Sequence, residues 1–272
     1  MLFASIVASL VIATAHPARM QPDQSTQQPQ TPPQVSQENL PEPEEVFEAY
    51  VEALGGREKM KEITSRRIDG RYVGRPFKFA ARLTIWQEFP NKFHVKIHEP
   101  AGETIEIGFD GKQGWERQPG IGLRYMEGLR LIELRDSSDF WGEANYKERY
   151  VDWSVVGRSI FQGQKAVGIH VKGVSGREKM LIFSEETGLY LGSRTFTVHP
   201  ETGEPAEFET VLKEYKDFDG IKFPTGLIQR FRGEENAAEF EYVRITMNPK
   251  EKHDFGPPAE LRDKNPEQDA GG

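Results

Sequence analysis

The histidines come nearest to a spacing that is used for chemistry. His94 and His98 stand four residues apart in a stretch that alternates apolar and polar side chains. On a β-strand both imidazoles lie on one face, but about 13 Å apart, which is too far for one metal ion. On a helix the spacing would suit zinc, yet no Glu-x-x-His arrangement accompanies it. We therefore expect no metal site, and we interpret both imidazoles as solvent-facing.

Other catalytic constellations are absent from the sequence. There is no cysteine and no Gly-x-Ser-x-Gly elbow, and Gly120, Gly122 and Gly128 lack the spacing of phosphate or dinucleotide loops. Paired glutamates, at 44–45, 185–186 and 234–235, are typical of solvated turns and helix starts. We predict a protein that is not an enzyme and uses no cofactor. The alternative is a hydrolase, which two facing carboxyl groups with raised pKa values would support.

The N-terminus has the composition of a secretory signal. Residues 2–15 are apolar and end in Ala-Thr-Ala, the small-x-small pattern of a cleavage site. This run is shorter than the about 20 residues that a membrane-spanning helix needs. No Lys or Arg precedes it, so a retained anchor is the alternative. We expect a periplasmic or otherwise extracytoplasmic protein that is soluble after cleavage of residues 1–15.

The charge of the chain limits its partners. The formal net charge is −8, and no basic cluster interrupts the acidic balance. Nucleic acids and anionic membrane surfaces are therefore unfavourable partners. Any contact with lipid should be made with acyl chains rather than through charge.

Composition also divides the chain into parts. Residues 16–43 are rich in Gln and Pro and nearly lack large apolar side chains, so we expect a disordered spacer. Residues 255–272 read as a disordered tail. The folded domain is predicted at 44–254, and it is large enough to fold without disulfides.

The domain is predicted to open with a helix and to continue as strands. Pro43 suits a first helical position, an apolar stripe follows at helical spacing, and Gly55-Gly56 ends it. From residue 77 onward the period changes to two, with one dry and one wet face. The turn pairs at 90–91, 110–111, 187–188, 202–203 and 219–220 lie between the alternating runs.

Two irregularities shape the predicted sheet. Phe240 and Tyr242 alternate in one phase and Val243, Ile245 and Met247 in the other, which indicates a bulge that bends the sheet. Residues 126–135 lose the alternation and indicate a short helix. About eleven strands with so few helices should curl. We predict a mainly β (α+β) fold, a bent or partly closed antiparallel barrel whose N-terminal and mid-chain helices cover the concave face.

Four segments in this order resemble a known family. They are YVEALGG (50–56) with Gly70 after it, FDGKQGW (109–115), EETGL (185–189) and YKDFDGIKFP (215–224). Together they are similar to LolA/LolB-like outer-membrane lipoprotein-sorting (lipoprotein carrier) proteins. The resemblance implies an unclosed barrel of about eleven strands, helices as a lid, no cofactor and an apolar cavity for acyl chains. The spacer and tail depart from the carrier, and none of its functional residues can be placed here.

The function that we predict is a binding function. We expect acyl chains of a lipid or lipoprotein to lie on the dry face. Binding would serve transport of the ligand to the outer membrane. An envelope membrane protein would be a further partner. We expect a monomer. The alternative is an envelope sensory or protein-interaction module with a filled core and no lipid ligand. The predicted cavity lining is Phe79, Leu83, Ile85, Phe93, Val95, Ile97, Ile105, Ile107 and Phe109, and the predicted lid residues are Met126, Leu129, Ile132 and Leu134.

Overall fold

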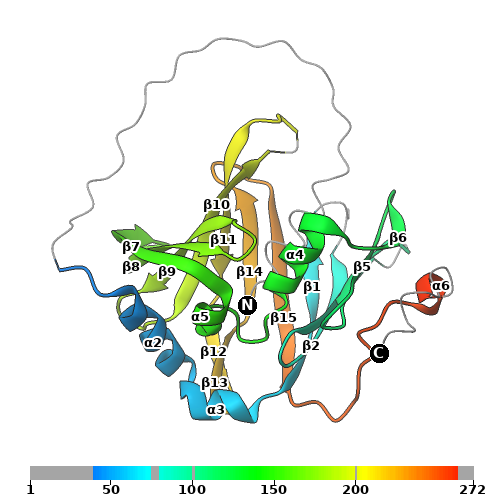
Figure 1. The fold of residues 1–272 in the computed structure, drawn as a ribbon, viewed down its shortest axis with the longest axis horizontal. Coiled ribbons are helices and arrows are strands. Elements are labelled where there is room, and N and C mark those ends of the chain that lie inside the picture. Colours follow the sequence, from blue (N-terminus) through cyan, green and yellow to red (C-terminus); the bar gives the residue numbers. More distant parts are fainter. Residues whose placement is uncertain (1–38, 75–79, 100–101, 200, 263–272) are drawn as a thin grey trace.

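The computed structural model describes residues 39–74, 80–99, 102–199 and 201–262 (Figure 1). They form one antiparallel sheet of 13 strands, a separate two-stranded hairpin and a few helices. The predicted fold class, mainly β with an unclosed antiparallel sheet and covering helices, is confirmed. There are more strands than the predicted eleven because several have only four residues, too few to show an alternation. The predicted signal at 1–15 and Phe79 lie outside the described residues.

The N-terminal helix begins and ends where the sequence predicts. Helix α2 (Pro43–Leu54) has Pro43 at its first position and Gly55 as its C-cap. Glu42 and Glu45 form a reciprocal capping box, which satisfies backbone groups at the helix start. Helix α3 (Gly56–Glu62) follows directly and turns Met60 into the core.

The strands form two groups that meet in the middle of the sheet. The first group is β1 (Ser65–Val73), β2 (Ala81–Glu88), β3 (Lys92–His98), β4 (Thr104–Phe109), β5 (Gly114–Gln118) and β6 (Gly122–Tyr125). The second is β7 (Tyr150–Phe161), β8 (Gln164–Gly173), β9 (Glu178–Ser184), β10 (Tyr190–Val198), β11 (Pro205–Leu212), β14 (Gly226–Phe231) and β15 (Ala237–Met247). Strands β12 (Tyr215–Phe218) and β13 (Ile221–Pro224) pair only with each other. The five predicted turn pairs all lie between consecutive strands.

The predicted bulge lies where β1 and β15 join the two groups. Asp69 pairs with Arg244 and Gly70 pairs with Tyr242, so Val243 is the extra residue. A Cβ on Gly70 would lie 2.0 Å from the carbonyl oxygen of Glu241, so the close approach requires glycine. A bulge increases the local twist and bend of a sheet. The curvature therefore has a defined cause near the middle of the sheet.

The mid-chain insert connects the two edges of the sheet. The strand order runs from β6 at one edge to β7 at the other, although these two strands are consecutive in the chain. The chain between them forms helix α4 (Gly128–Ser137), the 3-10 turn η2 (Gly142–Asn145) and helix α5 (Tyr146–Arg149). In Figure 1, α4 lies between the two groups of strands, and α5 lies over the second group, where it contacts β7. Helix α4 therefore lies at the opening of the unclosed barrel.

The C-terminal segment, residues 253–262, covers part of the outer face, which sequence reasoning did not anticipate. The structure describes the chain beyond the predicted domain end at Asp254, through helix α6 (Ala259–Arg262). Phe255 is buried, and Trp115 Nε1 donates a hydrogen bond to its carbonyl oxygen at 3.1 Å. The ion pair of Arg117 with Glu260 holds the segment further along.

The expectation that His94 faces solvent is wrong, because this segment lies over it. His94 is buried, and its Nδ1 lies 2.7 Å from His253 Nε2. Trp86 stacks on both imidazoles. Burial, with a contribution from His253, lowers the pKa of His94 to about 4. His98 is half-buried beside Thr104. In the described ranges, no three His, Asp or Glu side chains are grouped as a metal site.

Candidate functional site

The predicted cavity lining comes together on one face. Eight of the nine residues are described, and each is at most 1% exposed. They form cross-strand rows over β2, β3 and β4, such as Ile85, Val95 and Ile107. All eight belong to one core cluster with the apolar stripe of α2. The dry face is thus buried in the protein's own core.

Helix α4 covers the β5 end of this face, and the four predicted lid residues divide into two pairs. Met126 and Leu134 are buried, whereas Leu129 is 60% exposed and Ile132 is 36% exposed. Gly114 on β5 allows the close contact, because a Cβ there would lie 2.6 Å from Cδ2 of Leu134. The helix therefore turns apolar side chains both toward the core and toward the outside.

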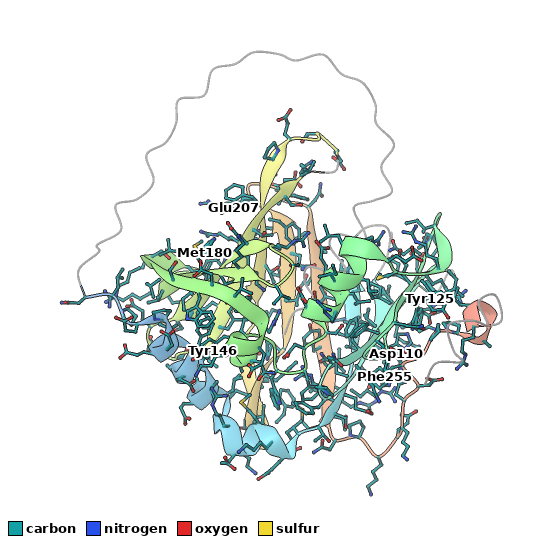
Figure 2. All side chains as sticks on the ribbon, in the orientation of Figure 1. Asp110, Tyr125, Tyr146, Met180, Glu207 and Phe255 are labelled. Atoms are coloured by element: carbon teal, nitrogen blue, oxygen red, sulfur yellow. The ribbon has the colours of Figure 1, made fainter. Side chains whose placement is uncertain are left out.

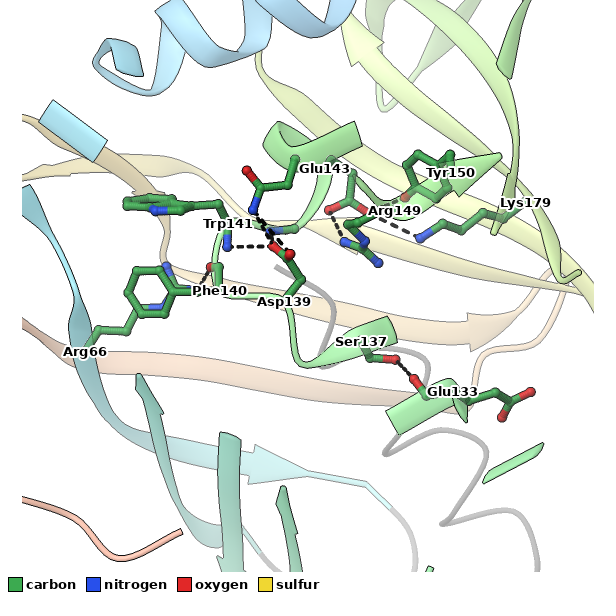
Figure 3. Close-up of polar contacts among 12 residues, drawn as sticks. Arg66, Glu133, Ser137, Asp139, Phe140, Trp141, Glu143, Arg149, Tyr150 and Lys179 are labelled. Carbon is green, nitrogen blue, oxygen red and sulfur yellow. Dashed lines mark hydrogen bonds and ion pairs between the residues drawn. The ribbon is translucent and has the colours of Figure 1, made fainter. Parts of the chain in front are cut away.

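A buried arginine holds the insert to the sheet. Arg66 on β1 is 2% exposed, and its Nη2 donates a hydrogen bond to the carbonyl oxygen of Phe140 (Figure 3). Its guanidinium group lies 4.2 Å from the ring centroid of Phe140 and 4.7 Å from that of Phe223. Burial lowers the pKa of Arg66 to about 9. Sequence reasoning missed this residue, because a charge at one strand position carries no sign of burial.

The loop after α4 is fixed by Asp139. Its Oδ1 accepts hydrogen bonds from the backbone N–H groups of Trp141 and Gly142, at 2.9 and 2.7 Å (Figure 3). Asn145 Nδ2 donates to the same oxygen at 3.0 Å. The insert is therefore rigid where it enters the core.

A charged cluster lies inside the protein beside α5. Glu143 is fully buried, and its Oε1 accepts hydrogen bonds from Lys179 Nζ at 3.2 Å and from the Tyr150 hydroxyl at 3.3 Å (Figure 3). Arg149 Nη1 lies 3.8 Å from Oε2 of Glu143. Burial alone would raise the pKa of Glu143, but the charges of Lys179 and Arg149 outweigh it and lower this pKa to about 2. Burial lowers the pKa of Lys179 to about 8, against the effect of Glu143.

Two cavities adjoin α4, and we name them the Arg149 chamber and the α4 groove. The chamber has a volume of about 50 Å³. The groove, of about 760 Å³, is open to solvent beside the outer face of β9 to β11. Met180 and Glu207, both labelled in Figure 2, are part of its wall. Both cavities share Glu133, Ser175, Arg177 and Lys179.

The α4 groove exposes apolar side chains. Leu129, Val156 and Phe196 line it and are 60, 47 and 78% exposed. Exposed apolar side chains that gather in a cavity indicate a binding surface, and the volume lies in the range of small-molecule sites. Of the predicted site residues, only Leu129 lies in this wall. The residues from β7, β9 and β10 come together only in three dimensions, so no sequence pattern shows them.

Comparisons with known proteins agree with this arrangement. No protein-family model matches the chain, and no curated protein matches it in sequence. A solved LolA superfamily protein from Nitrosomonas europaea superposes with a TM-score of 0.51 at 12% identity, over 80% of this chain and 98% of that one. A LolA-like fold is therefore present.

Two further solved structures superpose on this chain about equally well. A DUF1329 family protein from Desulfovibrio piger ATCC 29098 has a TM-score of 0.51 at 10% identity, over 77% of this chain and 94% of its own. A protein from Vibrio parahaemolyticus is described as a putative outer membrane lipoprotein-sorting protein domain. It has a TM-score of 0.50 at 8% identity, over 76% of this chain and 95% of its own. The predicted resemblance is confirmed as one of fold.

Proposed function

We propose that this LolA-like chain is a non-enzymatic extracytoplasmic protein that binds the acyl chains of a lipid or lipoprotein beside α4. The observation that carries the proposal is the open α4 groove, in which Leu129 of the predicted lid, Val156 and Phe196 expose apolar side chains between charged ones. Burying an acyl chain there gains about 0.8 kcal/mol per methylene. The α4 groove, with a volume of about 760 Å³, has room for an acyl chain of many methylenes.

The predicted cavity lining takes part in a second step. Helix α4 covers the β5 end of the dry face through Leu131 and Leu134, which contact Gly114. Lifting α4 would uncover the adjoining end of that face, where Phe109 pairs with Gly114. The acyl chain in the α4 groove would then extend along the apolar rows of β4, β3 and β2.

The cellular setting is proposed on the sequence and on the fold neighbours. The signal-like residues 1–15 support export, and one fold neighbour carries a lipoprotein-sorting description. In the part of the chain that the structure covers, no helix has the length and apolar character needed to cross a membrane. We propose a monomeric periplasmic carrier that delivers its ligand toward the outer membrane.

Native mass spectrometry of protein purified from its own envelope tests the proposal, together with titration by a fluorescent fatty acid. We expect a co-purifying lipid and saturable binding. Leu129→Asp and Phe196→Asp should each weaken binding about tenfold, because a charge then replaces one of the few apolar side chains that would contact the acyl chain. Val243→Asp is the matched control, because Val243 is 70% exposed but is not part of this wall. No lipid and no fatty-acid binding, or equal losses in all three variants, would contradict the proposal.

A second candidate function rests on the filled core. All eight described residues of the predicted lining are buried in one core cluster, as expected for an envelope sensory or protein-interaction module that holds no lipid. Function would then lie on the outer surface. The same titration separates the two candidates, because a module of this kind would take up no fatty acid in its wild-type form.

A further inference from the structure

Arg149 lines the Arg149 chamber, and two nitrogen atoms of its guanidinium group form no hydrogen bond. The residue is 8% exposed, and its Nε and Nη1 atoms are buried with no hydrogen-bond partner. A buried charged donor without an acceptor is costly, and nearly all such groups in folded proteins are satisfied. The side chain is therefore prepared for an acceptor that enters the chamber.

The charges around the chamber leave one cation in excess. Glu133 pairs with Arg177 at 2.5 Å. Asp136 Oδ1 lies 3.7 Å from Arg135. By contrast, Arg149 and Lys179 share the single carboxylate of Glu143. An anionic group in the chamber would balance this cluster. The net charge of −8 disfavours an anionic membrane surface, but it does not oppose one buried anion beside two cations.

The chamber also contains an acceptor. Asp136 Oδ2 is buried and receives no hydrogen bond. A carboxylate or a phosphodiester could accept from Arg149 but could not donate to Asp136. A phosphate monoester in its singly protonated form does both, since its P–OH group donates while its other oxygens accept. A volume of about 50 Å³ holds only a few water-sized groups, which suits a terminal phosphate and excludes a larger headgroup.

We propose that the Arg149 chamber binds a phosphate monoester, the terminal group of a lipid whose acyl chains lie in the α4 groove. The shared wall of Glu133, Ser175, Arg177 and Lys179 brings the two parts of such a ligand into contact with both cavities. The assignment of the phosphate to a lipid rests on the function proposed above. The chemistry of the chamber is the same for free inorganic phosphate.

Competition against a fluorescent fatty acid on the full chain tests this site. Dioctanoyl phosphatidic acid should bind at least about tenfold more tightly than dioctanoylglycerol, which has the same acyl chains and no phosphate. Arg149→Met should remove this difference and leave the affinity for dioctanoylglycerol unchanged. Lys216→Met removes an exposed positive charge outside the site and should retain the difference. Equal affinity of the two lipids for the wild-type protein overturns the lipid assignment.

A measurement on the wild-type protein covers the case in which Arg149→Met does not fold. Acetylation of Lys179, read by peptide mass spectrometry, should slow severalfold with dioctanoyl phosphatidic acid, whereas Lys216 should react as before. If neither lipid binds, the proposed function fails, and protection of Lys179 by inorganic phosphate alone would assign the chamber to free phosphate. If neither phosphatidic acid nor inorganic phosphate protects Lys179, the phosphate site itself is overturned.

Discussion

Helices α2 and α4 both cover the concave face, but they are held in different ways. Helix α2 has a capping box, and its five large apolar residues are all buried. One of them, Phe47, stacks on Tyr146 with ring centroids 4.2 Å apart. Helix α4 has no side-chain cap at Glu127 and buries only Leu134 fully. It leaves Leu129 exposed in the wall of the α4 groove.

The two helices therefore have different roles: α2 stabilises the fold, and α4 borders the proposed binding site. The side chains that α2 packs against include the aromatic rings of Phe183 and Tyr190, and the sequence signals for its start, its stripe and its end agree with the final structure. Beside α4 lie buried charges, unpartnered polar atoms and exposed apolar side chains. Departures of this kind from local rules concentrate at functional sites. Elements that move for binding also belong to the less stable part of a fold.

The largest effect should come from the α2 side. Phe47→Ala removes a fully buried ring and should lower the free energy of unfolding by about 3–5 kcal/mol. Leu129→Ala on α4 should change it by less than about 0.5 kcal/mol, because that side chain is exposed. Urea denaturation measures both. Similar losses in the two variants would remove the distinction between the helices.

Breaking the charged cluster should have a similarly large effect. Glu143→Gln leaves Lys179 and Arg149 buried without their carboxylate and should cost about 3–5 kcal/mol. Glu133→Gln removes one partner of a more exposed ion pair and should cost about 1 kcal/mol or less. A small loss for Glu143→Gln would mean that the cluster is hydrated.

The same residue gives a pH dependence with a defined sign. The folded-state pKa of Glu143 is about 2, below its ordinary value of 4.5. The unfolded state therefore binds more protons between these values, and the contribution of Glu143 is lost as the pH falls from about 4.5 toward 2. Between pH 4.5 and 2, wild-type protein should lose more stability than Glu143→Gln in urea titrations. Parallel loss in the two proteins would contradict this.

A change on β5 should act on α4 alone. Gly114→Ala places a Cβ 2.6 Å from Leu134 Cδ2 and 2.9 Å from Leu131 Cδ1. Both leucines must move, at a cost of about 1–3 kcal/mol. Hydrogen exchange should become faster in residues 128–137 and stay unchanged in 43–54. Faster exchange in both helices would show that they open together.

The smallest effect should come from a new cap. Glu127→Ser supplies the missing side-chain acceptor at the start of α4 and should stabilise the helix by about 0.5–1 kcal/mol. Exchange in residues 128–137 should then become slower, by about two- to fivefold. Unchanged exchange would indicate that α4 opens as part of a larger unit.

Much of the apolar side was predictable from the sequence because its signals are local. Pro43 marks the start of α2, alternation identifies the rows of β2 to β4, and a change of phase locates the bulge at Val243. The polar side was not predictable in this way. Glu143 and Lys179 are separated by 36 residues, and Arg66 and Phe140 by 74. His94 alternates as a wet residue, and only a distant C-terminal segment makes it dry.

Hydrogen exchange with and without a saturating fatty acid shows directly whether the ligand binds beside α4. We predict slower exchange in residues 128–137 of α4 and in residues 175–180, which contain the end of the β8–β9 connection and the start of β9, because both segments contribute to the wall of the α4 groove. Residues 43–54 of α2 should exchange as in the free protein. Protection of α2 without α4, or no protection anywhere at saturation, would exclude binding beside α4.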